Sequence, residues 1–117
     1  MTVEKIGTVA VVTGDSPIIS DVQSALDLIM SVKYNEGTNK IAIDKKTITE
    51  DFFILSTGLA GEILQKFINY DVKAAIYGDY SKYTSKPLRD FIYESNNGKD
   101  VFFCSTKDEA IKRLSEL

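Results

Sequence analysis

The sequence predicts an α/β fold with a central, mostly parallel sheet of four to five strands and about four helices. Short apolar segments rich in β-branched residues alternate with longer segments whose apolar residues recur at helical spacing, and polar turns separate them. The resulting order, β-α-β-α-β-α-β-α, is typical of parallel strands joined by crossover helices. A length of 117 residues suits one domain with its own core, so we expect residues 1–117 to form a single domain.

Four segments have the length and composition of buried strands. Valine, isoleucine, alanine and phenylalanine dominate them, and turns with glycine or polar residues bound them. They are residues 8–13, 40–43, 72–77 and 100–105. Residues 1–7 can supply an edge strand or a hairpin arm in front of the first strand.

Two helices are predicted to begin at capping boxes, in which two side chains three residues apart bond the first free N–H groups. Ser20 and Gln23 form one such pair, at the start of a helix that ends near Tyr34. Thr106 and Glu109 form the other pair, at the start of the last helix. The predicted apolar face of the last helix consists of Ala110, Ile111, Leu114 and Leu117.

The other two helices have equally clear apolar faces. One opens at Ser56-Thr57-Gly58, and its apolar face consists of Leu59, Ile63, Leu64, Phe67 and Tyr70. The other begins at Ser85 or Lys86, with Pro87 in its first turn, and ends at Asn97-Gly98. Its inward-facing residues are predicted to be Leu88, Phe91, Ile92 and Ser95.

Residues 44–70 combine polar side chains with closely spaced signals for a turn and a helix start. A polar turn and the aromatic segment 52–55 lead to Ser56 and Thr57 at the predicted helix start. Free N–H groups and a positive dipole end would lie there beside two hydroxyls that can be modified or bind anions. The run 58–61 lacks the GxGxxG pattern and the Walker lysine, so its small residues favour close packing against a strand or a partner.

Three aspartates directly follow predicted strands: Asp15, Asp44 and Asp79. Sites in open α/β sheets gather at the carboxyl ends of the strands, where three carboxylates could hold Mg²⁺. Aspartate is also favoured in turns by local hydrogen bonds, and no phosphate-binding loop accompanies these residues. The turn role is the stronger interpretation, so we assign no metal ligand and expect no cofactor.

Tyrosines and basic residues cluster after the third predicted strand. Tyr80, Lys82, Tyr83 and Arg89, together with Tyr77, make a plausible contact surface, because exposed aromatics beside arginine are typical interface anchors. Partly buried tyrosines would explain the same pattern almost as well. Earlier in the sequence, the adjacent acids Glu50 and Asp51 are interpreted as first-turn residues that compensate a helix dipole.

Composition narrows the functional classes. The chain has no histidine, which removes the Ser-His and Cys-His pairs of most hydrolytic triads, so a non-enzymatic role is favoured. The single cysteine, Cys104, falls in an apolar strand and is interpreted as core filler. A net charge of −3 without a basic block disfavours nucleic acid as a partner. With neither a signal-peptide pattern nor a long apolar run, we expect a cytoplasmic protein that does not bind membranes.

Three runs of sequence closely resemble a bacterial family called domain of unknown function 4180. They are ITEDFF (48–53), TGLAGEILQKF (57–67) and GDYSKYTSKPLRDFIYESN (78–96), and the resemblance extends over nearly the whole chain. It identifies relatives and implies no activity.

A second resemblance is to the STAS domain, the fold of anti-sigma factor antagonists. Those proteins carry an Asp-Ser-Ser/Thr-Gly-Leu motif at a helix start, and phosphorylation of the Ser or Thr before the glycine controls binding to a kinase partner. Residues 56–59 (STGL) stand at the matching place, so the resemblance implies Thr57 as the phospho-acceptor, although Leu55 replaces the motif's aspartate. Residues 101–114 (VFFCSTKDEAIKRL) resemble the closing strand and helix of that fold.

Three functional hypotheses remain open from the sequence. The first is a STAS-like regulatory module that binds a protein partner around Ser56, Thr57 and the loop 79–83. The second is a small-molecule or magnesium-binding protein, or a small enzyme, that uses the acidic strand ends. The third is a structural homodimer, which an exposed patch formed by Phe52 and Phe53 would favour.

Overall fold

The computed structural model describes all 117 residues, which form one five-stranded sheet and four α-helices. The strands are β1 (Thr2–Ile6), β2 (Val9–Thr13), β3 (Lys40–Asp44), β4 (Lys73–Tyr77) and β5 (Val101–Cys104). The helices are α1 (Val22–Ser31), α2 (Leu59–Asn69), α3 (Lys86–Asn96) and α4 (Lys107–Ser115). The predicted α/β class and the alternating order of elements are confirmed.

The strands lie in the sheet in their sequence order, β1-β2-β3-β4-β5. β1 pairs antiparallel with β2, and the remaining neighbours pair in parallel. The N-terminal hairpin arm that the sequence allowed is therefore present. Its turn uses Gly7 at φ +60°, a conformation that favours glycine.

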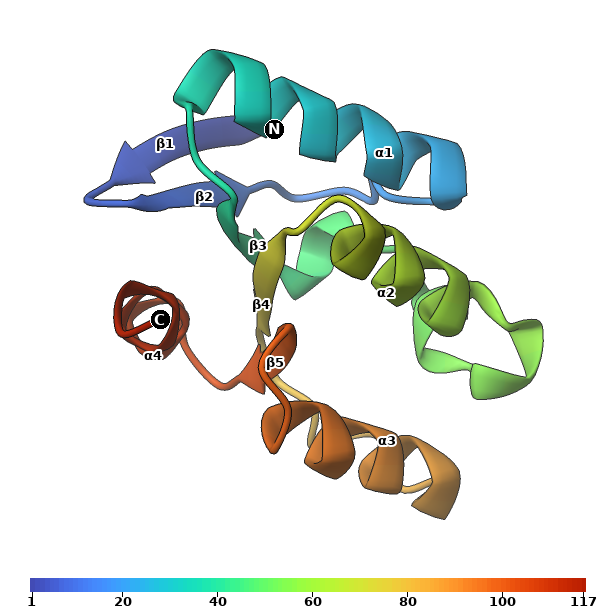
Figure 1. Ribbon diagram of the computed structural model, residues 1–117. Coiled ribbons are helices and arrows are strands. Elements are labelled where there is room, and N and C mark those ends of the chain that lie inside the picture. The colour runs from blue at the N-terminus through green and yellow to red at the C-terminus, as the bar shows by residue number, and fades with distance from the viewer.

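Helices cover both faces of the sheet, but unequally. Figure 1 shows α1, α2 and α3 on one face and α4 alone on the other. A core cluster of 21 buried residues lies under the three helices, and a second cluster of 9 lies under α4. Side chains of the central strands alternate between the two clusters, for example Ile41 and Ile43 on the first side and Ala42 on the second. This double burial explains why these strands have nearly continuous apolar sequences.

Helix α1 begins one residue later than predicted. Asp21 caps it by accepting a hydrogen bond from the Ser24 N–H at 2.8 Å, and the Ser24 hydroxyl accepts one from the Asp21 N–H at 3.1 Å. The predicted Ser20–Gln23 capping box is therefore wrong. A short π-helix, Val32–Glu36, extends α1 to Gly37, whose left-handed backbone ends it.

The start of α2 also differs from the prediction. Residues Glu50–Phe53 and Leu55–Thr57 form two 3-10 turns, and α2 begins only after Gly58. Gly58 has φ +78°, so the backbone cannot continue as a helix from the second turn into α2 without a break. Close packing at Gly61 is not observed, because a Cβ there would meet no atom within 4 Å.

Helix ends account for the remaining differences. Thr106 accepts the Glu109 N–H at 3.2 Å, but the Glu109 carboxylate accepts the Ser105 N–H, so only half of the predicted capping box forms. Leu117, predicted on the apolar face, follows the end of α4 and is 51% exposed. Tyr70 likewise follows the last residue of α2 and is 39% exposed. No helix has the length and apolar character needed to cross a membrane.

Candidate functional site

A pocket of about 400 Å³ lies at the carboxyl ends of β3 and β4. We call it the carboxyl-edge pocket; its lining residues are Pro17, Asp44, Lys45, Lys46, Ile48, Glu50, Gly78, Asp79 and Lys82. The pairing of Asp44 with Tyr77 aligns the two strand ends, so Lys45 and Gly78 leave the sheet side by side. A Cβ at Gly78 would stand 2.7 Å from the Lys45 Cβ, so the absence of a side chain lets Lys45 cross the β4 end.

The chain after β3 is fixed by backbone hydrogen bonds to the chain after β2. The N–H groups of Ile18 and Ile19 both donate to the Thr47 carbonyl, at 2.7 and 2.8 Å, and the Thr49 N–H donates to the Ile19 carbonyl at 2.9 Å. The Thr47 side chain is completely buried and donates to the Asp44 carbonyl at 2.7 Å. These contacts fix the backbone beside Pro17 and Ile48, which line the pocket, although neither segment is a regular strand.

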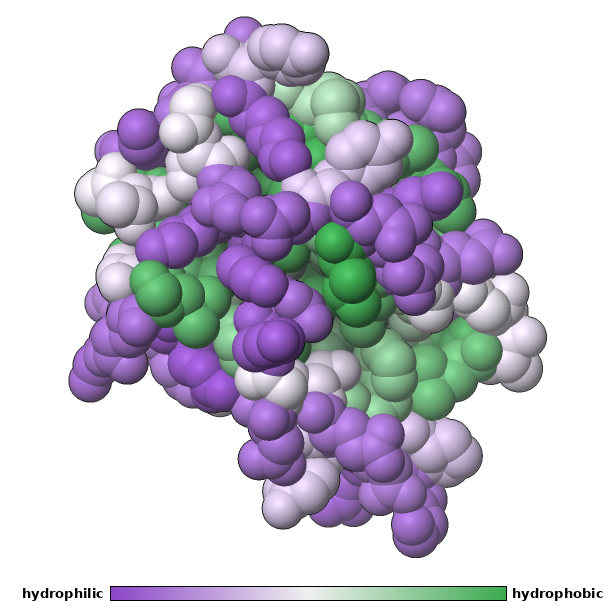
Figure 2. All heavy atoms as spheres, in the orientation of Figure 1, coloured by the Kyte–Doolittle hydropathy of each residue, from purple (hydrophilic) through white to green (hydrophobic).

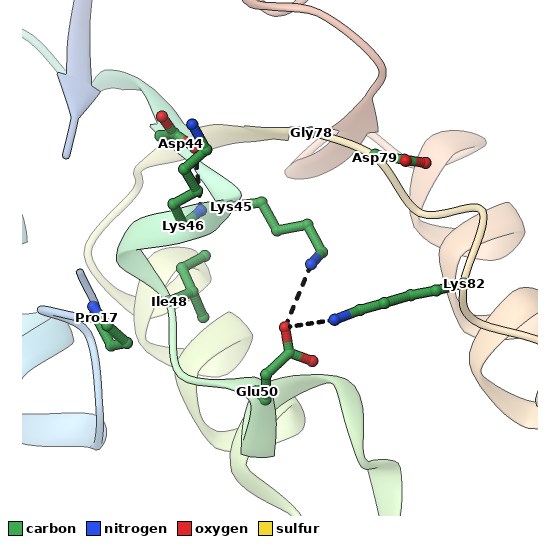
Figure 3. A pocket seen from close by; sticks show the side chains of 9 residues that line it. All are labelled: Pro17, Asp44, Lys45, Lys46, Ile48, Glu50, Gly78, Asp79 and Lys82. Atoms are coloured by element: carbon green, nitrogen blue, oxygen red, sulfur yellow. Dashed lines mark hydrogen bonds and ion pairs between the residues drawn. The ribbon is translucent and has the colours of Figure 1, made fainter. Parts of the chain in front are cut away.

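Glu50 is the centre of the polar contacts. Its carboxylate lies 3.4 Å from Lys45 Nζ and 3.1 Å from Lys82 Nζ (Figure 3). It also accepts a hydrogen bond from the Tyr83 hydroxyl at 2.9 Å. Partial burial raises the pKa of Glu50, but hydrogen bonds from Lys82 and Tyr83 and the charge of Lys45 outweigh it, so the pKa falls below its usual value. Glu50 thus fastens residues 78–85, the β4–α3 loop, to residues 45–58, the β3–α2 segment.

Two aromatic rings lie against the Lys45 ammonium group, which contacts Glu50. Lys45 Nζ lies 5.0 Å from the centre of the Phe53 ring and 4.8 Å from that of Tyr83, and those two rings stack at 5.1 Å. The Lys45 side chain is only 13% exposed. Tyr80 packs in the same cluster and donates its hydroxyl to the Ile76 carbonyl at 2.6 Å. Burial raises the pKa of Tyr80 and of Tyr83, so both hydroxyls remain protonated donors at neutral pH.

The aspartates at the carboxyl ends of β3 and β4 serve in turns. Asp44 accepts the Lys46 N–H at 3.0 Å and Asp79 accepts the Ser81 N–H at 2.8 Å, which is the turn role favoured from sequence. Hydrogen bonds from Ser81 lower the pKa of Asp79. Figure 3 shows these two side chains at opposite ends of the pocket, and Asp15 does not line it. No group of three or more acidic, cysteine or histidine side chains is arranged to hold a metal ion.

Ser56 and Thr57 lie beyond the pocket, in the second 3-10 turn. The Thr57 hydroxyl lies 2.9 Å from both the Asp51 and the Ile54 carbonyls, to which it can donate, and it accepts the Leu59 N–H at 3.2 Å. It therefore joins the two 3-10 turns to the start of α2. Ser56 is exposed, and its hydroxyl makes no hydrogen bond within the chain. Leu55, at the place of the aspartate in the STAS motif, packs against the core.

The predicted tyrosine surface divides between the two faces of the sheet. Tyr77 lies on the α4 face, where its hydroxyl donates to the Val12 carbonyl at 3.1 Å and burial raises its pKa to about 12. Its predicted place beside the other tyrosines is therefore wrong. A separate depression of about 480 Å³, the tyrosine groove, runs between the β4–α3 loop and α3. Its lining residues are Tyr80, Ser81, Tyr83, Thr84, Arg89, Ile92, Tyr93 and Asn96.

Two further sequence interpretations meet different outcomes. Phe52 and Phe53 are 1% and 4% exposed, so they do not form the surface patch that would favour a homodimer. Cys104 is buried as predicted, and burial raises the pKa of its thiol to about 11, which keeps it protonated at neutral pH.

Sequence reasoning missed the two residues that organise the polar contacts, Lys45 and Glu50. Glu50 does lie in a first turn, as predicted, but its carboxylate binds side chains from other elements. The available signal was Lys45 directly after a strand end, followed by an acid ahead of two phenylalanines. That signal is weak, because an exposed charge pair has the same sequence pattern.

Comparison with protein families gives a match to Domain of unknown function (DUF4180) over residues 5–114. The chain belongs to the DUF4180 family. This DUF4180 chain is also similar in structure to a Thermotoga maritima protein provisionally assigned as an anti-sigma factor antagonist. The TM-score is 0.52, and the match covers 97% of this chain and 93% of the other. At 15% identity the likeness shows a shared fold, so the predicted STAS-like fold is confirmed. No curated protein sequence matches significantly.

Proposed function

We propose that this DUF4180 protein is a non-catalytic regulatory module of the cytoplasm that binds a protein partner through its β3–α2 segment and β4–α3 loop. The observation that carries the proposal is the fastening of these two parts by Glu50, which Lys45, Lys82 and Tyr83 contact together. A surface fixed in this way loses little conformational entropy when a partner binds. The STAS-like fold supports the same role.

Phosphorylation of Thr57 would reach this surface through hydrogen bonds. The Thr57 hydroxyl lies within hydrogen-bonding distance of the Asp51 carbonyl, and Asp51 adjoins Glu50 in the same 3-10 turn. A phosphate on that oxygen removes the hydrogen that it donates and adds a charge of about −2 beside the free N–H groups of α2. The expected result is a shift of the turn that carries Glu50, and with it a change at the β4–α3 loop.

A photo-crosslinking amino acid at Ser81 tests the binding surface, and one at Lys112 is the control, because both residues are exposed but Lys112 lies on α4. The proposal expects one defined partner crosslinked in the native host through position 81 and not through position 112. Equal labelling at both positions, or none at position 81, would contradict it.

Intact-mass measurement of the protein from its host tests the switch separately. One added phosphate that disappears in Thr57→Val would support Thr57 as the acceptor. A phosphate that disappears in Ser56→Ala instead would assign the modification to the exposed neighbouring hydroxyl. An unmodified chain under all growth conditions would count against a switch and leave constitutive binding.

A second candidate function is small-molecule binding in the carboxyl-edge pocket. Its position at the carboxyl ends of parallel strands is the usual place for ligands in open α/β sheets, and its volume is of the right order. A thermal-shift screen of small anions and zwitterions, repeated on Lys46→Gln, would test it. A ligand whose stabilisation survives that change would lie elsewhere.

A further inference from the structure

We infer that the tyrosine groove binds an acidic peptide segment of a partner protein, with an apolar side chain against the tyrosine rings and a carboxylate on Arg89. This inference rests on the proposed function and specifies the chemistry of the partner. The face of the molecule seen in Figure 2 is mostly hydrophilic, with smaller apolar areas between the polar side chains. By contrast, half of the residues that line the tyrosine groove have aromatic or apolar side chains.

The wall of the groove is rigid. Tyr80 and Tyr83 are each held at both ends, by ring packing and by the hydrogen bonds of their hydroxyls to the Ile76 carbonyl and the Glu50 carboxylate. The Tyr80 ring also meets Phe103 at 5.7 Å, edge to face. Fixed aromatic rings offer a large contact area without a cost for ordering side chains on binding. The wall can therefore accept an apolar group as it stands.

The outer side of the groove comes from α3. Tyr93 is 71% exposed, a large fraction for an aromatic side chain, and lies one turn after Arg89 on the same helix face. The exposed ring extends the apolar wall beyond the part that the fold already covers. A partner side chain would bury it.

Arg89 supplies the charge that selects the ligand. It is exposed, it is the only charged residue in the groove lining, and its side chain forms no ion pair or hydrogen bond within the chain. Two nearby acids already have partners: Asp90 pairs with Lys86 at 2.6 Å, and Glu50 pairs with Lys45 and Lys82. Glu94, the other acid of α3, forms no ion pair with Arg89. The guanidinium is therefore available to an external carboxylate, which it can bind through two parallel hydrogen bonds.

Other ligand classes use these features less well. A nucleic acid would need several cations, whereas this groove has one on a chain of net charge −3. A proline-rich segment would use the tyrosines and leave the guanidinium without a partner. An acidic segment with one large apolar residue satisfies both parts of the groove, and its binding should weaken with added salt.

The test uses the full chain and fluorescent, end-blocked hexapeptides in which two Asp or Glu residues flank one Phe or Leu. Binding is measured by anisotropy and mapped by NMR shifts of backbone amides. We expect the shifts to follow the β4–α3 loop and α3. Arg89→Gln should weaken binding about tenfold, as expected for loss of a charged hydrogen-bonded pair, whereas Lys112→Gln should not change it. Tyr93→Ala should also weaken binding, while Asn/Gln versions of the peptide should bind the parent as weakly as the acidic peptide binds Arg89→Gln.

The outcomes separate this inference from the proposed function. If the amide and acidic peptides bind equally, if a proline-rich peptide binds better, or if Arg89→Gln has no effect, the acidic-peptide inference is wrong. Should no peptide bind while the crosslink through Ser81 persists, the partner contacts the loop by other chemistry and only the inference fails. Absence of both the peptide binding and the crosslink would remove the inference and the proposed function together.

Discussion

Three helices cover one face of the sheet, and a single helix covers the other (Figure 1). On the α4 face, only two residues, Ser105 and Thr106, connect β5 to α4, which leaves no room for additional structure. On the opposite side, the β3–α2 segment and the β4–α3 loop are longer, and they bring Lys45, Glu50 and the tyrosines together. The candidate site therefore arises where the connections between strands and helices are long, because the rigid sheet fixes the ends of each connection and the middle part can carry polar groups.

The largest expected effects test the two cores. Phe67→Ala should lower the free energy of unfolding by about 3–5 kcal/mol, because this 1% exposed ring fills the core beneath the three helices. Leu114→Ala, on the buried side of α4, should cost about 2–5 kcal/mol, because Leu114 and Ala110 are the two buried residues of this helix. Urea denaturation measures both. Leu117→Ala is the control and should be nearly neutral at 51% exposure; a midpoint of Phe67→Ala near that of the parent would show that the ring is not core.

A smaller effect is expected where the two connections cross. Gly78→Ala places a Cβ 2.7 Å from the Lys45 Cβ, so Lys45 must move away from Glu50 and the Tyr83 ring. We expect a loss of about 1–3 kcal/mol, the usual cost of overpacking. The amide of Tyr83 should shift in NMR spectra as the loop loosens. Unchanged stability and spectra would show that Lys45 adapts without disturbing the loop.

Gly58 and Gly61 provide a matched pair in the β3–α2 region. Gly58→Ala should destabilise the protein by about 1 kcal/mol, because φ is +78° and an L side chain is strained there. Gly61→Ala should be neutral or stabilising by about 0.5–1 kcal/mol, since it lies within α2 and its Cβ would meet no atom within 4 Å. Thermal unfolding of both variants measures the difference. Equal effects would mean that the break between the 3-10 turn and α2 is not required.

The smallest expected effect concerns pH. The pKa of Glu50 is lower in the folded protein than its ordinary value of 4.5, so the unfolded chain binds the proton first as the pH falls. The stabilisation is therefore fully present above pH 4.5 and is lost as the pH falls through the lower folded pKa. Glu50→Gln should lose less than about 1 kcal/mol at neutral pH, because the Glu50 side chain is 57% exposed. The difference from the parent should shrink in acid; a constant difference between pH 7 and pH 3 would contradict the ion contacts.

The sequence by itself determined the fold class of this protein and the order of its strands and helices along the chain. Strand and helix periodicities are local properties, and apolar runs such as residues 41–43 have a strong pattern because both faces of the strand are buried. The buried state of Phe67 and Cys104 and the turn role of Asp44 and Asp79 follow from the same local signals.

Only the tertiary structure decided which polar residues meet. Lys82 reaches Glu50 from 32 positions away in the sequence because β3 and β4 are neighbours in parallel register, and no local pattern encodes that distance. The same strand geometry sends Tyr77 to the α4 face while the loop returns Tyr80 and Tyr83 to the other, which splits a cluster that looks continuous in sequence. The physical reason is that side chains in a strand alternate between faces, whereas a loop is placed by the contacts that its ends and side chains make.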